Sequence, residues 1–240
     1  MATLHLRSFA GPADYPIITK LANANYELAE FPAIETEDET RNTFEHLEHC
    51  DPDKDVAIAE DDAGHALGYS RISWIDDPEG LRRYHFNLSV GREGEGLGAA
   101  SMLLNWAIER VHGLTDLNQS DRPTVMQTWV IDEKTQAGRL SLLAKAGFAP
   151  IRYGYFMLRN LSEPIEVPQL PDGIYTRPCT PDDDRPIFNA LHEAFRDHWG
   201  YAPPPDFDAD FEEFRGWPLR NPALYQVAFA RDEDGREQVA

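Results

Sequence analysis

Apolar and polar residues alternate along residues 84–90, a pattern that predicts a half-buried strand. The apolar side of that strand carries Tyr84, Phe86, Leu88 and Val90. Further along, apolar residues recur at helical spacing, at Ala100, Leu103, Leu104, Ala107, Ile108 and Val111. The chain therefore changes from a strand to an amphipathic helix within residues 91–99.

The short connection between this strand and this helix is rich in glycine, with Gly94, Gly96 and Gly98 at alternate positions. Glycine can adopt positive φ and lets a ligand approach the backbone closely. The first turn of a helix also offers unpaired N–H groups at the positive end of its dipole. We therefore expect a cradle for a phosphate or pyrophosphate, formed by the main-chain amides of Glu95, Gly96, Leu97, Gly98 and Ala99.

Three other kinds of glycine connection compete with this interpretation. A Walker A loop is excluded, because it requires Gly-Lys-Ser/Thr and here Gly98 is followed by two alanines. A dinucleotide fingerprint is satisfied by count at Gly94, Gly96 and Ala99, but its strand is usually a continuous apolar run rather than an alternating one. An ordinary glycine turn between a strand and a helix stays open.

A second group of elements follows the predicted helix. The sequence predicts a strand over 124–130, a helix over 134–146 and a closing aromatic strand over 153–158. The dipeptide Gly147-Phe148 separates the helix from that last strand. A glycine at this place is also what an ordinary helix C-terminus favours.

Together these features resemble the GNAT superfamily of acyl-CoA N-acyltransferases. Its pyrophosphate loop reads Arg/Gln-x-x-Gly-x-Gly/Ala, and here the same frame holds Glu93, Gly96, Leu97 and Gly98. The resemblance covers about residues 80–160. It implies an α/β (α+β) fold, with a mixed, mostly antiparallel sheet of six or seven strands flanked by helices. It also implies acetyl-CoA as cosubstrate, bound by Leu88, Ser89, Val90, Glu93, Gly94, Glu95, Gly96, Leu97, Gly98 and Ala99.

The implied reaction transfers an acetyl group directly from the thioester to a small-molecule amine. A lysine-like amine of pKa about 10.4 must lose a proton first, which costs about 4.6 kcal/mol at pH 7. By analogy with the family, a backbone N–H near residues 88–90 would polarise the thioester carbonyl. The base candidates are His85, Glu79 and Asp132. A polar strand position for His85 and a helix cap for Asp132 are the structural alternatives.

Two departures from the family pattern bear on catalysis. The position where the family often carries a proton-donating tyrosine holds Leu143, so Tyr153 or Tyr155 would have to substitute for it. Glu93 stands where arginine or glutamine is usual and would oppose a pyrophosphate, although Arg92 offsets its charge. The alternative function is a noncatalytic acyl-CoA-binding or scaffold half of a tandem GNAT protein.

The two ends of the chain resemble each other. Five residues recur 170 positions later, namely Arg7, Pro16, Ile17, Leu21 and Ala24, as Arg177, Pro186, Ile187, Leu191 and Ala194. Residues 57–64 are likewise echoed by residues 228–235. We infer an internal duplication, as in two-copy GNAT proteins of the mycothiol synthase type.

The duplication predicts three parts of the chain. These are a GNAT domain over 1–160, a Pro-rich linker over 161–172 and a partial second copy over 173–240. The second copy is expected to form a strand over 174–177, a helix over 183–198 and a strand over 225–231. That last strand would present an unpaired edge, so we expect it to dock on the first domain, to pair with another chain, or to continue into a longer natural protein.

Composition and charge limit the classes of molecule that the protein is expected to bind. Lysine and arginine number 22 against 42 acidic residues, a formal charge of −20 that disfavours nucleic acid and anionic membranes and favours a cationic amine. Cys50 and Cys179 have no metal-site or disulfide spacing, and no secretory start or membrane span is evident, so we expect a cytoplasmic protein. His46, His49 and Cys50 would share one face of a helix over 36–50, but acidic neighbours favour a solvated surface over a metal site.

Overall fold

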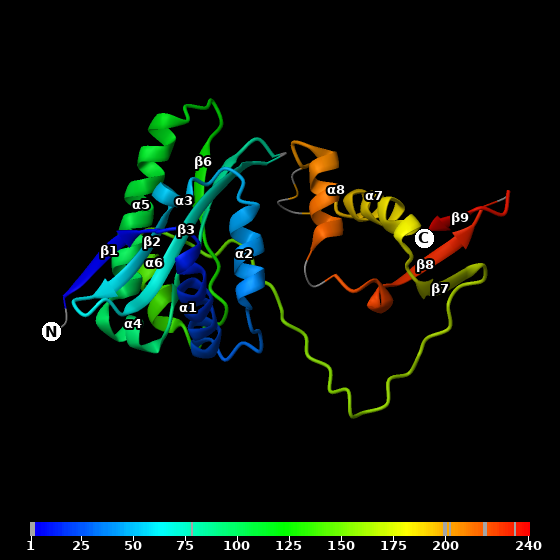
Figure 1. Ribbon diagram of the computed structural model, residues 1–240, viewed down its shortest axis with the longest axis horizontal. Helices are drawn as coiled ribbons and strands as arrows, with labels where there is room; N and C mark the ends of the chain where they lie inside the picture. Colours follow the sequence, from blue (N-terminus) through cyan, green and yellow to red (C-terminus); the bar gives the residue numbers. More distant parts are fainter. Residues whose placement is uncertain (1–2, 78, 199–200, 202, 218–219, 233) are drawn as a thin grey trace. The chain divides into compact units, whose positions relative to one another are not determined.

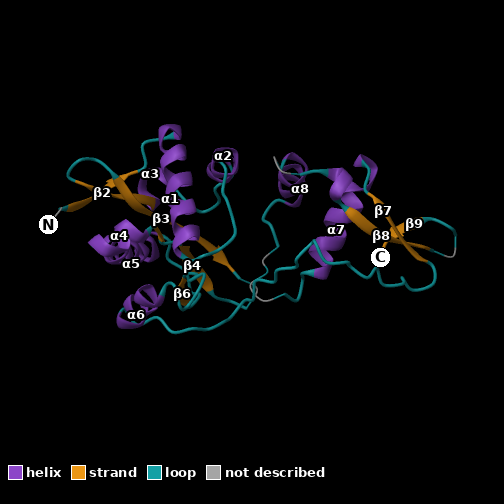
Figure 2. Ribbon diagram, turned by 90° about the horizontal axis from the view of Figure 1, so that it is seen from below, coloured by secondary structure: helices purple, strands orange, loops and turns teal. Residues whose placement is uncertain are grey.

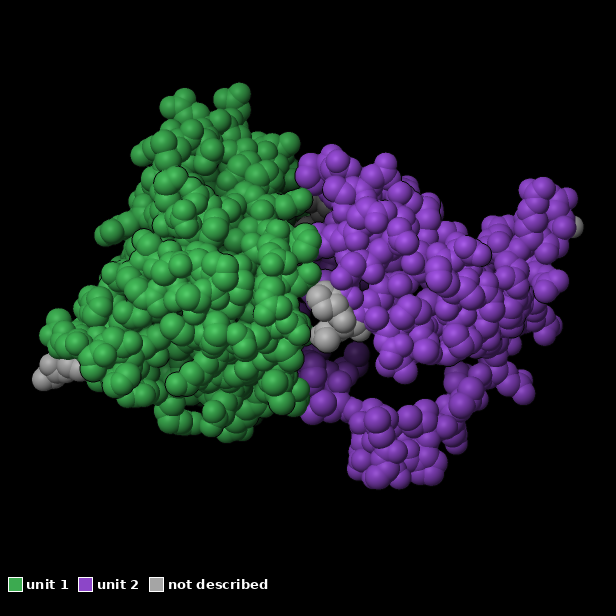
Figure 3. All heavy atoms as spheres, in the orientation of Figure 1, with its two compact units in different colours: residues 1–149 green, residues 150–240 purple. Residues whose placement is uncertain are grey.

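The computed structural model describes residues 3–77, 79–198, 201, 203–217, 220–232 and 234–240. Glu233 of the predicted echo and the first two residues of the predicted domain lie outside this described part. The chain divides into two compact units, residues 1–149 and 150–240, which Figure 3 colours separately.

The first unit is built on one six-stranded sheet (Figure 1). Its strands run in the order β1 (Leu4–Ser8), β2 (Val56–Asp61), β3 (Ala66–Asp76), β4 (Arg82–Phe86) and β6 (Thr124–Gln127), with β5 (Ser89–Val90) also paired to β3. All pairs are antiparallel except β4 with β6, which is parallel. The prediction of a mixed, mostly antiparallel sheet flanked by helices is confirmed.

Helices cover both faces of this sheet (Figure 2). One face carries α1 (Tyr15–Leu28) and α2 (Glu37–Glu45). Two shorter helices, η1 (Pro12–Asp14) and α3 (Pro52–Asp55), also lie between β1 and β2 in the chain. The other face carries α4 (Arg92–Leu97), α5 (Ala99–Leu117) and α6 (Ala137–Lys145). Local signals fix several ends: the Thr36 hydroxyl and the Glu39 carboxylate form a reciprocal capping box at the start of α2.

The strand β2 separates two apolar cores. Val56 and Ile58 join Ile18, Leu21 and Phe44 on the side of α1 and α2. The alanines between them, Ala57 and Ala59, face the helix α5 together with the larger core of buried residues such as Leu103, Leu104, Tyr84 and Phe86. A strand with both faces buried cannot show the simple alternation that marks a half-exposed strand.

Three predicted elements of the first unit differ in extent from those of the structure. The strand expected over 84–90 is interrupted at residues 87–88, where the Arg71 N–H donates to the side-chain Oδ1 of Asn87 at 2.7 Å. The strand expected to reach residue 130 ends at Gln127. The helix expected from residue 134 begins at Ala137, because the preceding residues form a turn.

The helix α6 ends at a glycine with left-handed backbone, as the sequence predicts. Gly147 has a φ of 91°, and the Phe148 N–H donates to the Leu143 carbonyl at 3.0 Å, which closes the helix in a Schellman arrangement.

The prediction of an aromatic strand over 153–158 is wrong. Residues 149–173 carry neither helix nor strand, and every side chain from 151 to 161 is exposed. Alternation alone forms no strand where the segment pairs with no neighbouring strand.

The second unit is a three-stranded antiparallel sheet in the order β7 (Ile174–Pro178), β8 (Gln226–Arg231) and β9 (Glu237–Val239). Its helices are η2 (Pro181–Asp183), α7 (Asp184–Ala194), α8 (Phe207–Gly216) and η3 (Pro222–Leu224). The helix predicted to reach residue 198 therefore ends at Ala194. The edge expected on β8 is also corrected, because β9 pairs with it.

Bilayer crossing needs a long helix of low polarity. None of the helices in the described part of the chain combines the required length with the required hydropathy.

Candidate functional site

The glycine-rich connection is a pair of helices joined by a single bend. The helix α4 spans Arg92–Leu97, and its C-cap, Gly98, has a φ of 89° and a ψ of 16°. The helix α5 begins at the next residue. Gly94 and Gly96 are helical, so the expectation of positive φ holds at Gly98 and is wrong at the other two glycines. Left-handed backbone at this one position turns the chain between the helices.

The three glycines of the connection differ in how much space surrounds them. A Cβ atom on Gly94 would lie 2.2 Å from the Leu67 carbonyl oxygen and 2.8 Å from Cγ1 of Val90, so this glycine lets α4 pack directly on β3. A Cβ atom on Gly96 would meet nothing within 4 Å, and the same holds at Gly98. The bend is therefore open to solvent on the side of Gly96 and Gly98, and closed on the side of Gly94.

The amides available at the bend differ from the predicted set. The Glu95 N–H donates to the Gly91 carbonyl at 3.0 Å, and the Gly98 N–H to the Glu95 carbonyl at 3.3 Å. Gly96 and Leu97 lie in the last turn of α4, where amides bond within the helix. The first internal bond across the bend runs from the Met102 N–H to the Gly98 carbonyl at 3.2 Å. Residues 99–101, in the first turn of α5, therefore carry the backbone N–H groups that have no acceptor within the helix.

Leu88, Ser89 and Val90 lie where β4 gives way to β5. Ser89 and Val90 pair with Tyr69 and Gly68 of β3. In a strand, residues two apart direct their backbone groups to the same edge. The carbonyls of Leu88 and Val90 both accept from Arg139, at 2.9 and 3.1 Å. The edge of β5 that turns away from β3 is thus bound by a side chain of α6.

All five N–H groups of the Arg139 guanidinium are used. Besides the two carbonyls, Nη1 donates to Oδ1 of Asn25 at 2.6 Å, Nε donates to Oε1 of Glu95 at 2.9 Å, and Nη2 also contacts that carboxylate. The Arg139 side chain is 2% exposed and that of Glu95 27%. Gln136 extends the network by donating to Asn25 at 3.2 Å. Arg139 therefore connects α1, α4, β5 and α6.

Sequence analysis did not identify Arg139. One signal was present, because Arg139 stands four residues before the buried Leu143 and hence on the apolar face of α6. A charge on an apolar helix face indicates a buried partner. The partners themselves are distant in sequence, so the pattern does not name them.

His85 belongs to a chain of polar groups on the opposite face of β4 from Tyr84 and Phe86. Nε2 of Gln127, on β6, lies 3.0 Å from Nδ1 of His85, and Nη1 of Arg83 lies 3.4 Å from Oε1 of the same glutamine. Burial, and then the positive charge of Arg83, lower the pKa of His85 below its ordinary value. His85 is therefore neutral at pH 7.

The orientation of Gln127 decides which nitrogen of His85 carries the proton. Arg83 donates to Oε1 of the Gln127 amide. The NH2 group of that amide therefore faces His85 and donates to Nδ1 of the ring. The neutral ring then holds its hydrogen on Nε2. In this orientation His85 offers a hydrogen-bond donor at Nε2. Acceptance of a proton at Nε2 requires the other tautomer, in which the Gln127 amide is turned over and its bond from Arg83 is given up.

The other predicted base candidates lie apart from one another. Glu79 is 51% exposed and forms an ion pair of 2.7 Å with Arg83, which links it indirectly to His85. Asp132 accepts from the N–H groups of Lys134 and Thr135 at 2.9 and 2.7 Å and from the Thr135 hydroxyl at 2.9 Å, and these bonds lower its pKa. Asp132 is thus a turn cap. Tyr153 is 68% exposed in the segment without helix or strand.

Two further expectations are changed by the structure. Leu143, at the position expected for a tyrosine, is 5% exposed within the core around α5.

The helix expected over 36–50 ends at Glu45, so His46, His49 and Cys50 do not share a helix face. His49 has a φ of 49° and stacks on Trp74 with ring centroids 3.9 Å apart. Among the described residues, no group of three or more His, Cys, Asp and Glu side chains is placed to hold a metal ion.

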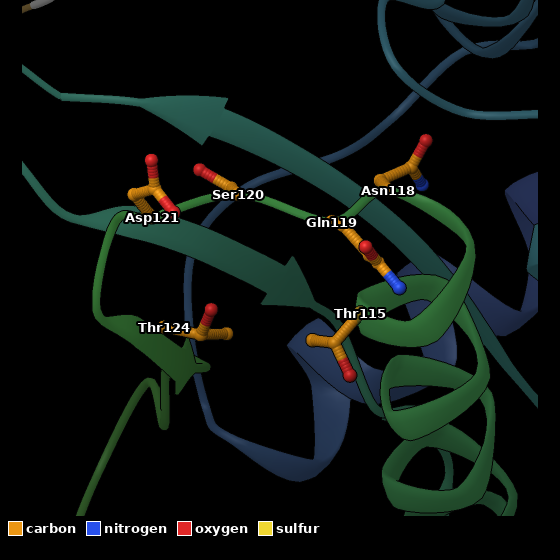
Figure 4. Close-up of a pocket in the computed structure, with 6 residues that line it drawn as sticks. All are labelled: Thr115, Asn118, Gln119, Ser120, Asp121 and Thr124. Carbon is orange, nitrogen blue, oxygen red and sulfur yellow. The ribbon is translucent and has the colours of Figure 1, made fainter.

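Two shallow hollows lie at opposite ends of α5. One is polar and is lined by Thr115, Asn118, Gln119, Ser120, Asp121 and Thr124, between the end of α5 and the start of β6 (Figure 4). The other adjoins the bend and is lined by Leu6, Gly98, Ser101, Met102, Asn105, Trp106 and Glu109. A helix of 19 residues is about 28 Å long, so the polar hollow is remote from the bend.

No protein-family model matches the chain, and no curated protein matches it. Among solved structures, the chain is similar to a GCN5-related N-acetyltransferase from Sphaerobacter thermophilus, with 21% identity, a TM-score of 0.67, and coverage of 98% of this chain and 69% of that one. It is also similar to a GCN5-related glucosamine N-acetyltransferase region in a fungal multi-domain GH3 beta-N-acetylglucosaminidase. That match has 14% identity, a TM-score of 0.51, and coverage of 99% of this chain and 27% of that one. The fold is the GNAT fold.

Proposed function

We propose that the first unit uses acetyl-CoA to acetylate a small-molecule amine. The observation that carries this proposal is the conjunction of two features of a GNAT fold: an edge at Leu88–Val90 that carries a side chain of α6 rather than another strand, and a helix bend at Gly98 that opens to solvent. The edge suits an extended chain with amide groups, and the bend suits a phosphate. Coenzyme A carries both kinds of group.

The residues present fit the phosphates through the backbone. Amides of the first turn of α5 would donate to a diphosphate, and the open space at Gly96 and Gly98 leaves room for it. Ala99 and Ala100 are 0% and 2% exposed and Ser101 is exposed, so the Ser101 amide is the one that belongs to an exposed residue. Glu93 is exposed in the first turn of α4, one turn before Gly96, so its carboxylate would oppose an anion while the neighbouring Arg92 offsets it. From the predicted set we keep Leu88 and Val90 for the extended part of the cosubstrate and Gly96, Gly98 and Ala99 for the diphosphate. Gly94 and Glu95 are not kept, because Gly94 packs on β3 and the Glu95 N–H donates to Gly91.

The acyl group would lie at the edge of β5. The N–H groups of Leu88 and Val90 share that edge with their carbonyls and would polarise the thioester carbonyl, which supplies the electrophile. We assign proton acceptance from the amine to His85 in the state where the Gln127 amide is turned over. The net charge of −20 favours a cationic amine substrate, and a cytoplasmic location is the matching expectation.

A second candidate function is a noncatalytic acyl-CoA-binding or scaffold half of a tandem GNAT protein. Two observations favour it: Arg139 fills the edge at Leu88 and Val90, and the core residue Leu143 stands at the expected tyrosine position. The match to the Sphaerobacter thermophilus protein extends over both units and supports the tandem arrangement, with domains over 1–160 and 173–240. Tyr153 remains a candidate proton donor under the first function.

Calorimetry with acetyl-CoA on the full chain, followed by thiol-release assays on a panel of amines, tests the proposal. We expect binding, and turnover with a cationic amine. Gly96→Glu places a carboxylate in the open space at the bend, so it should abolish binding. Gly113→Glu is the matched control, because Gly113 lies within α5, also faces open space and should leave binding unchanged. Binding without turnover would favour the scaffold function, and absence of binding would reject both.

A further inference from the structure

We propose that Arg139 is a latch that competes with acetyl-CoA for the edge of β5 that turns away from β3. The latch consists of the Arg139 guanidinium with its four partners, the side chains of Asn25 and Glu95 and the carbonyls of Leu88 and Val90. This inference rests on the proposed function, since it concerns the same edge. It makes Arg139 the residue that determines cosubstrate affinity.

The contacts place Arg139 where a ligand would pair. Leu88 and Val90 are two residues apart, so their carbonyls lie on one edge, opposite the edge that pairs with β3. An extended ligand with amide groups binds such an edge by donating to the carbonyls and accepting from the N–H groups. Arg139 already donates to both carbonyls, at 2.9 and 3.1 Å. The acceptor half of the edge is therefore occupied.

Electrostatics makes the latch stable but allows it to open. A buried guanidinium is tolerated because each of its N–H groups is bonded and because Glu95 supplies the opposite charge. Glu95 is 27% exposed, so its carboxylate can be solvated after the ion pair breaks. A ligand amide that donates to Leu88 or Val90 replaces a bond that Arg139 gives up. Opening thus exchanges partners rather than leaving the carbonyls unpaired.

The latch lowers apparent affinity by a calculable amount. If the open state is populated at a fraction f, the apparent dissociation constant for acetyl-CoA is the intrinsic constant divided by f. Removing the guanidinium removes this factor. The opposite role, in which Arg139 assists binding by neutralising Glu95 beside the bend, predicts weaker binding when Arg139 is replaced. The sign of the change in affinity therefore separates the two roles.

The first test measures acetyl-CoA affinity by calorimetry in the wild-type chain and in Arg139→Ala and Arg139→Lys. We expect the dissociation constant to fall at least tenfold in Arg139→Ala and by less in Arg139→Lys, since lysine keeps the charge but offers three donors. Arg110→Ala is the matched control, because Arg110 also forms a mostly buried ion pair, with Asp55 at 2.7 Å, away from this edge. It should lose stability without a change in affinity.

The second test uses the wild-type chain and stays informative if Arg139→Ala fails to fold. The Arg139 Nε–H should exchange slowly with solvent in NMR spectra of the free protein, and saturating acetyl-CoA should remove this protection. Protection that persists with acetyl-CoA bound, or an affinity unchanged or weakened in a folded Arg139→Ala, overturns the latch and leaves the proposed function standing. Absence of binding in every folded variant overturns the proposed function and the latch together.

Discussion

The first strand and helix of each unit are joined by the same kind of arginine–aspartate fork. In the first unit Arg7 of β1 donates twice to Asp14, at 2.8 Å for each bond, and in the second Arg177 of β7 donates twice to Asp183, at 2.7 and 2.9 Å. Both aspartates also accept a backbone N–H, from Ala10 at 2.7 Å and from Thr180 at 2.8 Å. A local motif is thus built alike at both ends of the chain.

The hairpins that follow are also alike. Asp61 and Asp232 each begin a turn in which their side chain accepts two backbone N–H bonds, and Gly64 and Gly235 complete these turns with φ angles of 81° and 78°. The N–H of each glycine donates to the carbonyl of the aspartate at 2.9 Å. These bonds involve close neighbours in sequence, so they form wherever the short motif occurs.

The two units differ in what covers these motifs. The first packs a six-stranded sheet between helices and holds two apolar cores. The second has three strands. Arginines stack on aromatic rings in both units, with Arg82 4.0 Å from the ring centroid of Trp74 and Arg177 3.9 Å from that of Phe229, so this contact does not distinguish them. The comparison teaches that a short sequence specifies the motif, whereas burial depends on how much chain surrounds it.

The largest expected difference concerns the forks. Asp14→Ala should lower the free energy of unfolding of the first unit by about 3 kcal/mol, because it removes the bidentate partner of Arg7 and the acceptor of the Ala10 N–H at a site where the carboxylate is 5% exposed. Arg7 then keeps its bond to Glu60, at 2.6 Å. Asp183→Ala should cost the second unit about 1–2 kcal/mol, since Arg177 and Asp183 are 29% and 13% exposed. Urea unfolding with a hydrogen-exchange readout for each unit measures both. Equal losses would contradict the burial argument.

Low pH should weaken the arginine–aspartate forks of both units. Burial alone would raise the pKa of Asp14, but bonds from Arg7 and the Ala10 N–H outweigh it and lower that pKa; the Arg177 bond is the main cause of the low pKa of Asp183. The ordinary aspartate pKa is about 3.9, so the unfolded chain takes up protons first. Stability from both forks should be full above pH 5 and fall as the pH drops below 4. Asp14→Asn and Asp183→Asn should flatten this fall in thermal unfolding between pH 5 and 2.

The smallest effects should be equal in the two units. Gly64→Ala and Gly235→Ala place a side chain at positive φ with nothing within 4 Å of the new Cβ, so each should cost about 1 kcal/mol from backbone strain alone. Gly113→Ala is the control of opposite sign, because alanine is favoured within the helix α5. Chemical denaturation measures all three. A cost at Gly235 much larger than at Gly64 would show that the hairpins are not equivalent.

Sequence reasoning succeeded where a structure depends on near neighbours. The turn at Asp132 and the C-terminus of α6 at Gly147 match the local signals that predicted them. It failed where partners had to be supplied from elsewhere. The aromatic run at 153–158 forms no strand, and the strand expected through Asn87 is interrupted where that side chain accepts from Arg71, 16 positions away.

The local pattern was sufficient to predict the long helix α5, a glycine-dependent turn before it and the repetition of short motifs at both ends of the chain, because these depend on residues close in sequence. The helix α4 and the restriction of positive φ to Gly98 were not predicted. What fills the edge of β5 depends on tertiary packing. Arg139 meets Glu95 and Asn25 across 44 and 114 positions of sequence. Contacts of such separation arise when α1, α4 and α6 pack around one sheet, since packing alone buries the guanidinium and sets its partners.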